Sequence, residues 1–530
     1  MVWNYFFRGK QTTNKLSRIS QRLCVALLSL CLFWVMGFQA VWADEITPSN
    51  SSIQPYLKRV KREITEFTLD NGMRFIVLER HRAPVISFLI YADVGGVDEP
   101  NGQTGVAHYL EHLAFKGTQR IGTTNYQAEE KILEKQDRIF EQLKQAKTEG
   151  NNEKIKQLIS DLETLSLEAD QYIQQNEFGR IVAQAGGVGL NATTSADATS
   201  YFYSLPANKL ELWMSLESER FLEPVFREFY KEKQVILEER RLRTDNSPIG
   251  QMIEAFSATA FTTHPYRRPV IGYVEDLENL TRENVQNFFE TYYVPNNLTV
   301  AIVGDVNPME VKRLAEIYFG RYPAKPQPPK LNIVEPAQTE TREVTLTLKT
   351  QPWYLEGYPS PAANHPDSVI YDMISSLLSY GRTSRLYKSL VEEQQIALTA
   401  QGSSGYPGNK YSNLMLFYAM PAPGHTVDQV AIALRQEIDR LKTELVSETE
   451  LERVKTQAKA NLLRSLDSNM GMASALVEYE VKTGSWLNLF EELEKIEAIT
   501  PQDIQRVAQE AFQPQKRTIG RLLSDEQTLN

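Results

Sequence analysis

The sequence predicts an α+β protein whose two domains share one fold and are joined by a proline-rich linker. A chain of 530 residues is too long for a single hydrophobic core. Residues 280–304 (LTRENVQNFFETYYVPNNLTVAIVG) align without gaps on residues 499–523 (ITPQDIQRVAQEAFQPQKRTIGRLL), which indicates an internal repeat. Residues 321–342 lie between the repeats and contain five prolines without apolar periodicity. We therefore expect domains at 63–320 and 343–530, with a semi-rigid linker between them.

The N-terminal residues are typical of a secretory leader. Residues 1–22 carry five basic side chains and no acidic one, and residues 23–38 (LCVALLSLCLFWVMGF) are almost wholly apolar. We expect cleavage after residue 43, which leaves a polar segment at 44–62 as the start of the mature chain. An uncleaved membrane anchor is the alternative, because the apolar run of about 16–20 residues is at the lower limit for a membrane span. In both cases the protein is expected to be exported, to the periplasm or out of the cell.

The composition excludes several functional classes. With 42% apolar and 23% charged residues, the chain has the makeup of a folded globular protein. Loss of residues 1–43 leaves 52 basic against 67 acidic residues and a net charge of −15, so no nucleic-acid partner is expected. Both cysteines, Cys24 and Cys31, lie in the leader. Disulfides, cysteine-ligated zinc and thiol catalysis are therefore excluded for the mature chain.

The first domain is expected to begin with a sheet that supports a helix. Residues 67–78 (FTLDNGMRFIVL) alternate apolar and polar side chains around Asn71-Gly72, a strong hairpin signal. Residues 85–96 (VISFLIYADVGG) predict a second strand, and the proline- and glycine-rich residues 100–105 predict a loop. A helix is expected to begin near Thr104 and to pack against this sheet.

Residues 125–175 differ in character from their surroundings. They are rich in Glu, Lys and Gln, and their apolar residues recur at helical spacing. The sequence EGNN at 149–152 interrupts this pattern, so we predict a helical hairpin. We expect a self-contained surface spacer that is dispensable for folding, and a docking arm for a partner is the alternative.

The helix after the loop carries the residues with the clearest chemistry. In AHYLEHLAF (107–115), the side chains of His108, Glu111 and His112 share one face, because residues three and four apart are neighbours on a helix. Three interpretations are a helix with incidental histidines, a structural zinc site and a catalytic zinc site. A structural site would usually be completed by Cys or another His, whereas two His and one carboxylate leave a zinc position open for water. The order H-x-x-E-H is the inverted zincin signature, with Glu111 as the general base.

A third metal ligand is expected from a different helix. Residues 227–246 (REFYKEKQVILEERRLRTDN) contain Glu232 and Glu239, which are seven residues apart and therefore lie on one face two turns apart. Spacing alone leaves open which of the two is the ligand.

Three motifs in this order resemble the catalytic half of the pitrilysin/insulinase family of metallopeptidases, which includes the mitochondrial processing peptidases. They are AHYLEHLAFKGT (107–118), GLNATTSADATSYFYSLP (189–206) and EKQVILEERR (232–241). HPYRRPVIG (264–272) and the final strand of each half fit as well, and the resemblance covers about 65–525. It implies two metallohydrolase-like α/β-sandwich domains that enclose a chamber, and zinc-dependent cleavage of peptides.

The resemblance also implies roles for individual residues. His108 and His112 would bind Zn²⁺ with Glu239 as the third ligand, Glu111 would be the catalytic residue that polarises the zinc-bound water, and Glu232 would orient a ligand from outside the metal sphere. For Glu232, an ordinary exposed helix carboxylate is the alternative.

Residues 191–193 (Asn-Ala-Thr) match the edge strand to which these enzymes add the substrate, so Asn191 is a candidate substrate-binding residue. An ordinary strand residue is the alternative reading of Asn191. The separation of His112 and Glu239 exceeds that usual in the family, and the excess corresponds to the predicted hairpin at 125–175.

The second half departs from the family pattern in two ways. The position that mirrors the zinc helix reads YDMISSLLSYGRTSRLYKSL (371–390) and has no histidine, so no second zinc site is expected. Many members also hold the substrate with an Arg and, seven residues later, a Tyr, where this chain has Val391 and Leu398. Other residues, namely Arg382, Arg385 or Tyr387, are alternative sources of that contact.

These observations predict a secreted or periplasmic zinc endopeptidase that cleaves extended or unfolded peptides by attack of a zinc-activated water. The expected partners are peptide or protein substrates and a related subunit that would form a heterodimer, with membrane contact only if the leader is uncleaved. The alternative is a catalytically dependent or inactive subunit that acts mainly as a scaffold in a complex similar to a processing peptidase.

Overall fold

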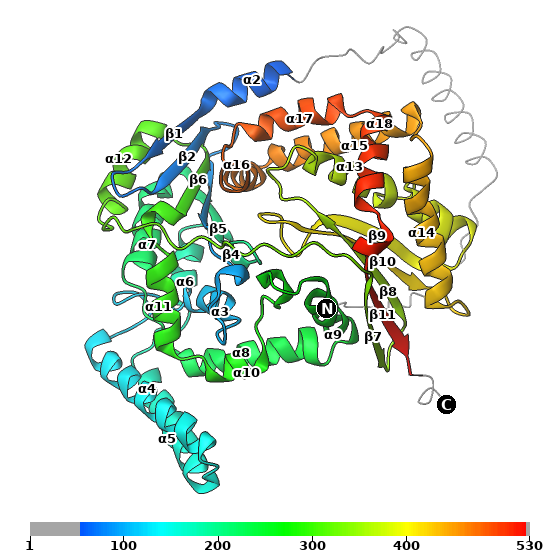
Figure 1. Ribbon diagram of the computed structural model, residues 1–530. Helices are drawn as coiled ribbons and strands as arrows, with labels where there is room; N and C mark the ends of the chain where they lie inside the picture. The colour runs from blue at the N-terminus through cyan, green and yellow to red at the C-terminus, as the bar shows by residue number, and fades with distance from the viewer. Residues whose placement is uncertain (1–53, 526–530) are drawn as a thin grey trace, which may run out of the picture. The chain divides into compact units, whose positions relative to one another are not determined.

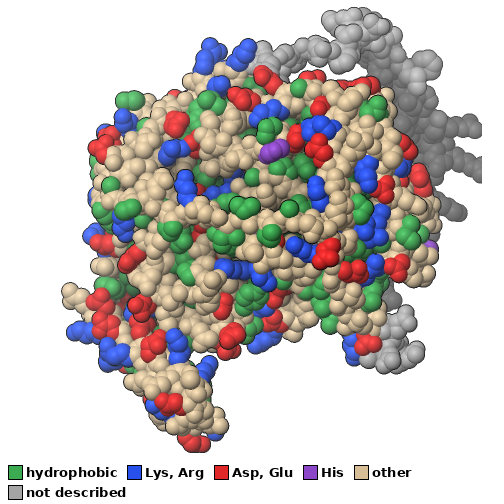
Figure 2. All heavy atoms as spheres, viewed as in Figure 1, with side chains coloured by type: hydrophobic (Ala, Val, Ile, Leu, Met, Phe, Trp, Pro, Cys, Tyr) green, Lys and Arg blue, Asp and Glu red, His purple; other side chains and the backbone are tan. Residues whose placement is uncertain are grey.

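The computed structural model describes residues 54–525 (Figure 1). The predicted leader at 1–43 lies outside the described residues, as does most of the polar segment at 44–62. Residues 59–525 belong to one compact unit. Within the described residues, we find no helix with both the length and the apolar character that a membrane crossing requires. On the face drawn in Figure 2, acidic and basic side chains are interspersed over the described residues.

The first half contains a six-stranded sheet in the order β1-β2-β6-β3-β5-β4. Its strands are β1 (Ile64–Thr68), β2 (Arg74–Glu79), β3 (Val85–Ala92), β4 (Val188–Thr194), β5 (Thr199–Pro206) and β6 (Leu298–Gly304). Strands β2 and β6 are parallel, and the other neighbours are antiparallel. The predicted hairpin is present, since Phe67 pairs with Phe75 and Gly72 makes the turn with a φ of 94°.

The helices of the first half are α2 (Gln54–Glu63), α3 (Val106–Leu113), α4 (Tyr126–Thr148), α5 (Asn152–Asp170), α6 (Glu177–Gln184), α7 (Leu210–Leu222), α8 (Phe229–Arg240), α9 (Pro248–Ala260), α10 (Val274–Asn279), α11 (Arg282–Tyr292) and α12 (Pro308–Tyr318). With two exceptions, α2 and α9, these helices contribute residues to the hydrophobic core of the first half. Shorter turns are the 3₁₀ helices Gly96–Asp98, Ala207–Lys209, Pro265–Arg267 and Pro295–Asn297 and the π-helix Arg241–Asp245.

Helices α4 and α5 pack against each other and project from the first half (Figure 1). The expectation of a self-contained spacer is wrong for the base of this hairpin. Glu129 on α4 is fully buried and accepts a hydrogen bond from Arg227 Nε at 2.8 Å. Asp137 accepts from the Tyr230 hydroxyl at 3.0 Å, and Phe140 belongs to the main hydrophobic core. The base of the hairpin is therefore part of the first half's interior.

The second half repeats the strand order of the first. Its sheet runs β7-β11-β8-β10-β9, which corresponds to β2-β6-β3-β5-β4, and in both sheets only the first of these pairs is parallel. The strands are β7 (Arg342–Leu348), β8 (Trp353–Ser360), β9 (Ala397–Tyr406), β10 (Asn413–Pro421) and β11 (Thr518–Ser524). The helices are α13 (Ser368–Ser379), α14 (Val427–Thr443), α15 (Glu448–Asp467), α16 (Asn469–Thr483), α17 (Asn488–Ala498) and α18 (Pro501–Ala511), with the π-helix Tyr387–Glu393 and the 3₁₀ helix Pro514–Lys516. The predicted duplicated α+β fold is thus confirmed.

The aligned repeat has the same local structure in both halves. Helices α11 and α18 begin with capping boxes at Thr281 and Thr500, where the Thr hydroxyl accepts a hydrogen bond from the backbone N–H three residues later. Each helix is followed by a proline-initiated 3₁₀ turn and then by a central strand, β6 or β11. Between the halves, residues 323–339 contain neither helix nor strand.

The two halves exchange one helix each. Helix α9 of the first half packs on β7 and β11, and helix α16 of the second half packs on β3 and β6. Phe256 on α9 reaches the second sheet closely, because a Cβ placed at Gly520 would lie 3.0 Å from its ring and one at Gly357 would lie 2.9 Å from it. Side chains alternate between the two faces of a strand, so each sheet has its own helices on one face and the borrowed helix on the other. The interior of each half therefore includes one helix from the other half.

Candidate metal centre

Helix α3 is fixed at its start by a buried carboxylate. Glu99 is buried, and its two oxygens accept hydrogen bonds from the backbone N–H groups of Gly105 and Ala107 at 3.0 Å each. Gly105 has a φ of 87°, and a Cβ there would lie 2.6 Å from the carbonyl oxygen of Ile271, so only glycine fits. These contacts set where α3 starts and hence the direction of its polar face.

The structure brings three of the predicted residues together. Glu239 Oε2 lies 3.8 Å from His108 Nε2 and 3.6 Å from His112 Nε2. The candidate donor atoms of the three residues all lie within 4.8 Å of one another, and no other His, Cys, Asp and Glu residues in the described part of the chain form such a group. A tetrahedral Zn²⁺ with bonds of about 2.0–2.2 Å separates its ligand atoms by roughly 3.3–3.6 Å. The group therefore fits a zinc ion in both chemistry and spacing.

Glu232 lies behind His112 and is not among these donor atoms. The Nδ1–H of His112 donates to Glu232 Oε1 at 2.8 Å, and Lys116 Nζ donates to Glu232 Oε2 at 2.6 Å. A carboxylate only accepts hydrogen bonds, so this contact assigns a proton to Nδ1, and the neutral form of the imidazole would then have Nε2 free. Glu239 thus faces both imidazoles, whereas Glu232 faces only that of His112.

The surroundings set the charge of these groups. Burial lowers the pKa of His108 to about 3, assisted by the charges of His112 and Arg243, so His108 is neutral, which is the state in which an imidazole can bind a metal. Burial alone would raise the pKa of Glu232, but the hydrogen bonds from His112 and Lys116 outweigh it and lower the pKa to about 2. Glu232 is therefore an anion at neutral pH.

Glu111 projects beside the metal-binding group without joining it. Its Oε2 accepts a hydrogen bond from Thr194 Oγ1 at 2.5 Å, which connects α3 to strand β4. Burial raises the pKa of Glu111 above its usual value, and the hydrogen bond from Thr194 opposes that shift. A half-buried carboxylate beside a candidate metal position and hydrogen-bonded to Thr194 is suited to proton transfer.

Strand β4 is the last strand in the order of the first sheet. Asn191 is exposed on it and pairs with Phe202 of β5, and the register is irregular between Val188 and Asn191. Within the described residues, the other side of β4 has no strand partner. An extended peptide can therefore add to the sheet at this edge.

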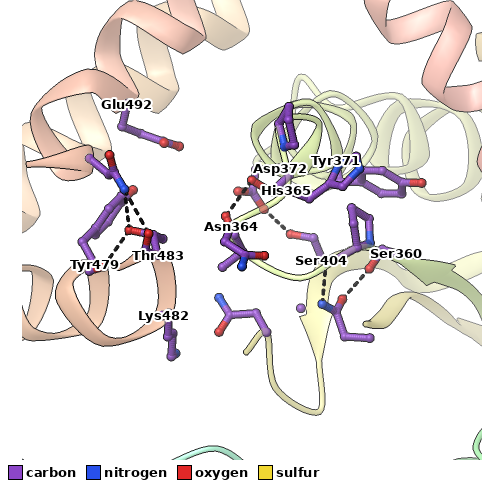
Figure 3. A pocket seen from close by; sticks show the side chains of 18 of the residues that line it. Ser360, Asn364, His365, Tyr371, Asp372, Ser404, Tyr479, Lys482, Thr483 and Glu492 are labelled. Atoms are coloured by element: carbon purple, nitrogen blue, oxygen red, sulfur yellow. Dashed lines mark hydrogen bonds between the residues drawn. The ribbon is translucent and has the colours of Figure 1, made fainter. Parts of the chain in front are cut away.

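In the second half, α13 occupies the place that α3 has in the first. The turns after the two helices both contain a glycine with positive φ, Gly117 and Gly381. Counting back from these glycines places Asp372 where His108 stands, and two serines at the positions of Glu111 and His112. Asp372 accepts a hydrogen bond from Ser404, and it borders a cavity of about 500 Å³ between α13 and the helices α16 and α17 (Figure 3). Across that cavity, burial raises the pKa of Glu492 to about 7.

The residues at the expected substrate clamp are apolar. Val391 lies in the π-helix Tyr387–Glu393 and packs against the second half's core, and Leu398 is 51% exposed on edge strand β9. Of the alternative residues, Arg385 is engaged by Glu450 through hydrogen bonds of 3.0 and 2.8 Å. The guanidinium of Arg385 is therefore held in an ion pair within the second half.

Three residues at the site were not predicted from the sequence. Lys116 contacts Glu232, Thr194 contacts Glu111, and Arg243 Nη1 lies 2.9 Å from Glu239 Oε1. The spacing of Glu239 and Arg243 is i,i+4, a pattern of paired charges that would have indicated this contact. Thr194 is 83 residues from Glu111 in the chain, and local sequence patterns do not predict contacts over such a separation.

Comparison with known proteins gives consistent matches over most of the chain. The family model described as "Insulinase (Peptidase family M16)" matches residues 74–147 and 162–273, and the one described as "Peptidase M16 inactive domain" matches residues 279–458. The first match leaves out only the outer part of the hairpin, residues 148–161.

Individual relatives agree with the family match. The chain is 28% identical to the zinc protease PqqE of Helicobacter pylori over 458 residues, which cover 85% of this chain and 90% of that protein. It is 25% identical to a probable mitochondrial-processing peptidase subunit beta of Schizosaccharomyces pombe, with 84% and 87% covered. Among solved structures, a protease from Helicobacter pylori matches with a TM-score of 0.74 and 27% identity over 87% of this chain and 99% of that one.

Proposed function

Because this chain belongs to the insulinase family of M16 peptidases, we propose that it is a zinc-dependent endopeptidase that cleaves extended or unfolded peptides outside the cytoplasm. The observation that carries the proposal is the group of His108, His112 and Glu239 beside the carboxylate of Glu111. Two imidazoles and one carboxylate form the donor set of a hydrolytic zinc site, in which one position remains for water or substrate.

In this proposal His108, His112 and Glu239 hold Zn²⁺. When bound, the ion lowers the pKa of a water molecule toward about 7 and polarises the scissile carbonyl. Glu111 would accept a proton from the attacking water as its oxygen bonds to the carbonyl carbon, and would give that proton to the amine nitrogen as the C–N bond breaks. Glu232 holds the imidazole of His112 through Nδ1, so that Nε2 points toward Glu239.

The substrate would bind as an additional strand on β4. The free edge of β4 supports this, as does the hydrogen bond from Thr194 on β4 to Glu111. Backbone hydrogen bonds along such an edge require an extended peptide, so unfolded segments are the expected substrates. Asn191 lies on the exposed part of this strand and would contact the bound peptide.

Export is proposed from the leader-like residues 1–43. A solved relative of the same fold, 19% identical to this chain, is the periplasmic protease PqqL of Escherichia coli. The membrane would be involved only if the leader remains uncleaved.

A related subunit is the second part of the proposal. Val391 and Leu398 stand where an Arg and a Tyr are expected, and two relatives are named as beta subunits of mitochondrial-processing peptidase. We propose that a heterodimer partner supplies the missing pair. The competing proposal is that the chain is an inactive subunit that acts as a scaffold. The same two apolar residues favour this alternative.

The experiment uses the purified mature chain loaded with zinc and an unstructured fluorogenic peptide. Cleavage by the native protein is expected, with loss of cleavage in Glu111→Gln, which retains all three metal-binding side chains. Bound zinc is measured in both proteins and should be equal. Equal cleavage by both proteins would contradict the role of Glu111, and zinc binding without cleavage even in the presence of a partner would favour the scaffold.

A further inference from the structure

The two oxygens of the Glu239 carboxylate have separate partners. Oε2 faces the imidazole nitrogens of His108 and His112, whereas Oε1 forms an ion pair with Arg243 Nη1 at 2.9 Å. Arg243 lies in the π-helix Arg241–Asp245, which continues α8 directly after Arg240, the residue next to Glu239. The same short stretch of chain thus presents both a metal-binding carboxylate and the cation that holds it.

The neighbouring arginines have other partners. Arg240 donates to both oxygens of Glu254 and to the carbonyl of Gly272, and Arg241 pairs with Glu238. Arg243 is 71% exposed and is the member of this series that contacts Glu239. An ion pair so exposed adds little to the stability of the fold, so loss of Arg243 should leave the metal-free protein folded.

Each of the two α8 carboxylates at the site forms an ion pair with a basic side chain. Lys116 binds Glu232 at 2.6 Å, and Arg243 binds Glu239 at 2.9 Å. Without Arg243, Oε1 would have no cation beside it, and the carboxylate could rotate or present both oxygens to a metal. An arginine that holds one oxygen leaves the other in a fixed direction, because its guanidinium is planar and always charged.

We propose that Arg243 is a positioning residue that holds Glu239 by Oε1 so that only Oε2 is offered to the metal. This inference rests on the proposed zinc site. It concerns the metal affinity of this chain, which can be measured independently of peptide cleavage. Groups that orient a metal ligand in this way typically contribute about 10–100-fold to affinity.

The test compares Arg243→Gln and Arg243→Lys with Arg241→Gln as the matched control. Arg241 is in the same π-helix, is 57% exposed and also pairs with a glutamate, Glu238, that is not in the metal-binding group. The zinc dissociation constant of each protein is measured by competition with a chromophoric chelator. The thermal unfolding midpoint of each metal-free protein is measured alongside.

Arg243→Gln is expected to bind zinc about 10–100-fold more weakly than the native chain, with an unchanged metal-free unfolding midpoint. Arg243→Lys keeps the charge without the planar fork and should be intermediate, and Arg241→Gln should match the native chain. Equal zinc affinity in Arg243→Gln and Arg241→Gln would overturn the proposal, and so would a native chain that binds no zinc. A native chain that binds zinc but cleaves no peptide would contradict the proposed function. The zinc affinities of the variants would still test the role of Arg243.

Discussion

Thr194 Oγ1 donates a hydrogen bond to Glu111 Oε2 across 2.5 Å, and this bond connects the edge strand β4 to the metal-site helix α3. The proposed proton-transfer group is therefore held by the strand that would receive the substrate. A peptide that shifts β4 would also shift Glu111, so substrate binding and the position of the base are coupled through one side chain.

Replacing Thr194 with Val removes this hydrogen bond at nearly constant volume. A hydrogen bond to a charged group is worth about 1.5–3 kcal/mol, so kcat/KM is expected to fall by roughly one to two orders of magnitude. Bound zinc should be unchanged, because Glu111 is not in the donor group. Thr65→Val is the control, because Thr65 is exposed on β1, at the opposite edge of the same sheet. An equal loss of kcat/KM in both variants would contradict the assignment.

Glu239 and Glu232 should differ in their effect on metal content. Glu239→Gln removes one of three proposed ligands, and stoichiometric zinc should be lost. Glu232→Gln removes a group that is proposed to orient His112, and the affinity should fall by about 10–100-fold while zinc still binds at excess. Metal analysis after dialysis against graded zinc concentrations separates the two. Full zinc occupancy in Glu239→Gln together with loss in Glu232→Gln would reverse the assignment.

Replacing residues 125–175 with a short Gly/Ser linker should destabilise the protein. The change leaves Arg227, whose side chain is 1% exposed, without the carboxylate of Glu129. An uncompensated buried charge costs about 3–5 kcal/mol. Urea unfolding of Arg227→Met should show a comparable loss, whereas Arg138→Met, at a position that is 64% exposed on the same helix as Glu129, should have little effect. A deletion variant as stable as the native chain would restore the spacer interpretation.

Glu335 in the linker should make stability depend on acid pH. Its carboxylate accepts hydrogen bonds from the backbone N–H groups of Thr262, Thr263 and His264 at 2.7–2.9 Å. Burial alone would raise its pKa, but these bonds and the Thr262 hydroxyl lower it to about 2. The unfolded chain therefore binds this proton more readily than the folded chain, so the stabilisation is present above about pH 4.5 and is lost as the pH falls toward 2.

Glu335→Gln should lower the unfolding free energy by about 1 kcal/mol at neutral pH. The difference from the native chain should shrink as the pH falls below about 4.5. Denaturant unfolding across this pH range measures it, with the exposed linker residue Glu340 changed to Gln as control. A difference that stays constant with pH would show that Glu335 is not the titrating group.

The isolated chain should be a weak peptidase that gains activity with a related subunit. Val391 and Leu398 provide no cation or hydroxyl near the substrate, and loss of one group that stabilises an oxyanion typically lowers kcat by about 10²–10³-fold. The measurement is peptide turnover by a strictly monomeric preparation, repeated after addition of the purified related subunit. High turnover by the monomer, abolished in Glu111→Gln, would contradict the need for a partner.

Local patterns in the sequence were sufficient for much of this structure. Asn71-Gly72 determines its hairpin through backbone geometry, and the histidine pair on α3 follows from helical spacing. The aligned repeat predicted two sheets of one topology, because matching caps and proline turns give matching elements. These features depend on residues that are close in the chain.

Contacts between distant residues could not be predicted in the same way. The choice between Glu232 and Glu239 depends on how α8 is rotated against α3, and both carboxylates satisfy the helical spacing equally well. The buried state of Glu129 depends on Arg227, 98 residues later, and a Glu- and Lys-rich pattern is more often a solvated surface. Both features depend on contacts between residues that are distant in the chain.

The helix exchange between the halves has a consequence for how such a chain could arise. A single half made alone would leave one face of its sheet without the helix that covers it. Two copies could cover each other only by each giving a helix to the other, which is the arrangement of a domain-swapped dimer with twofold symmetry. The chain resembles such a dimer whose two subunits are joined end to end. Because the linker connects the halves covalently, their association does not depend on protein concentration.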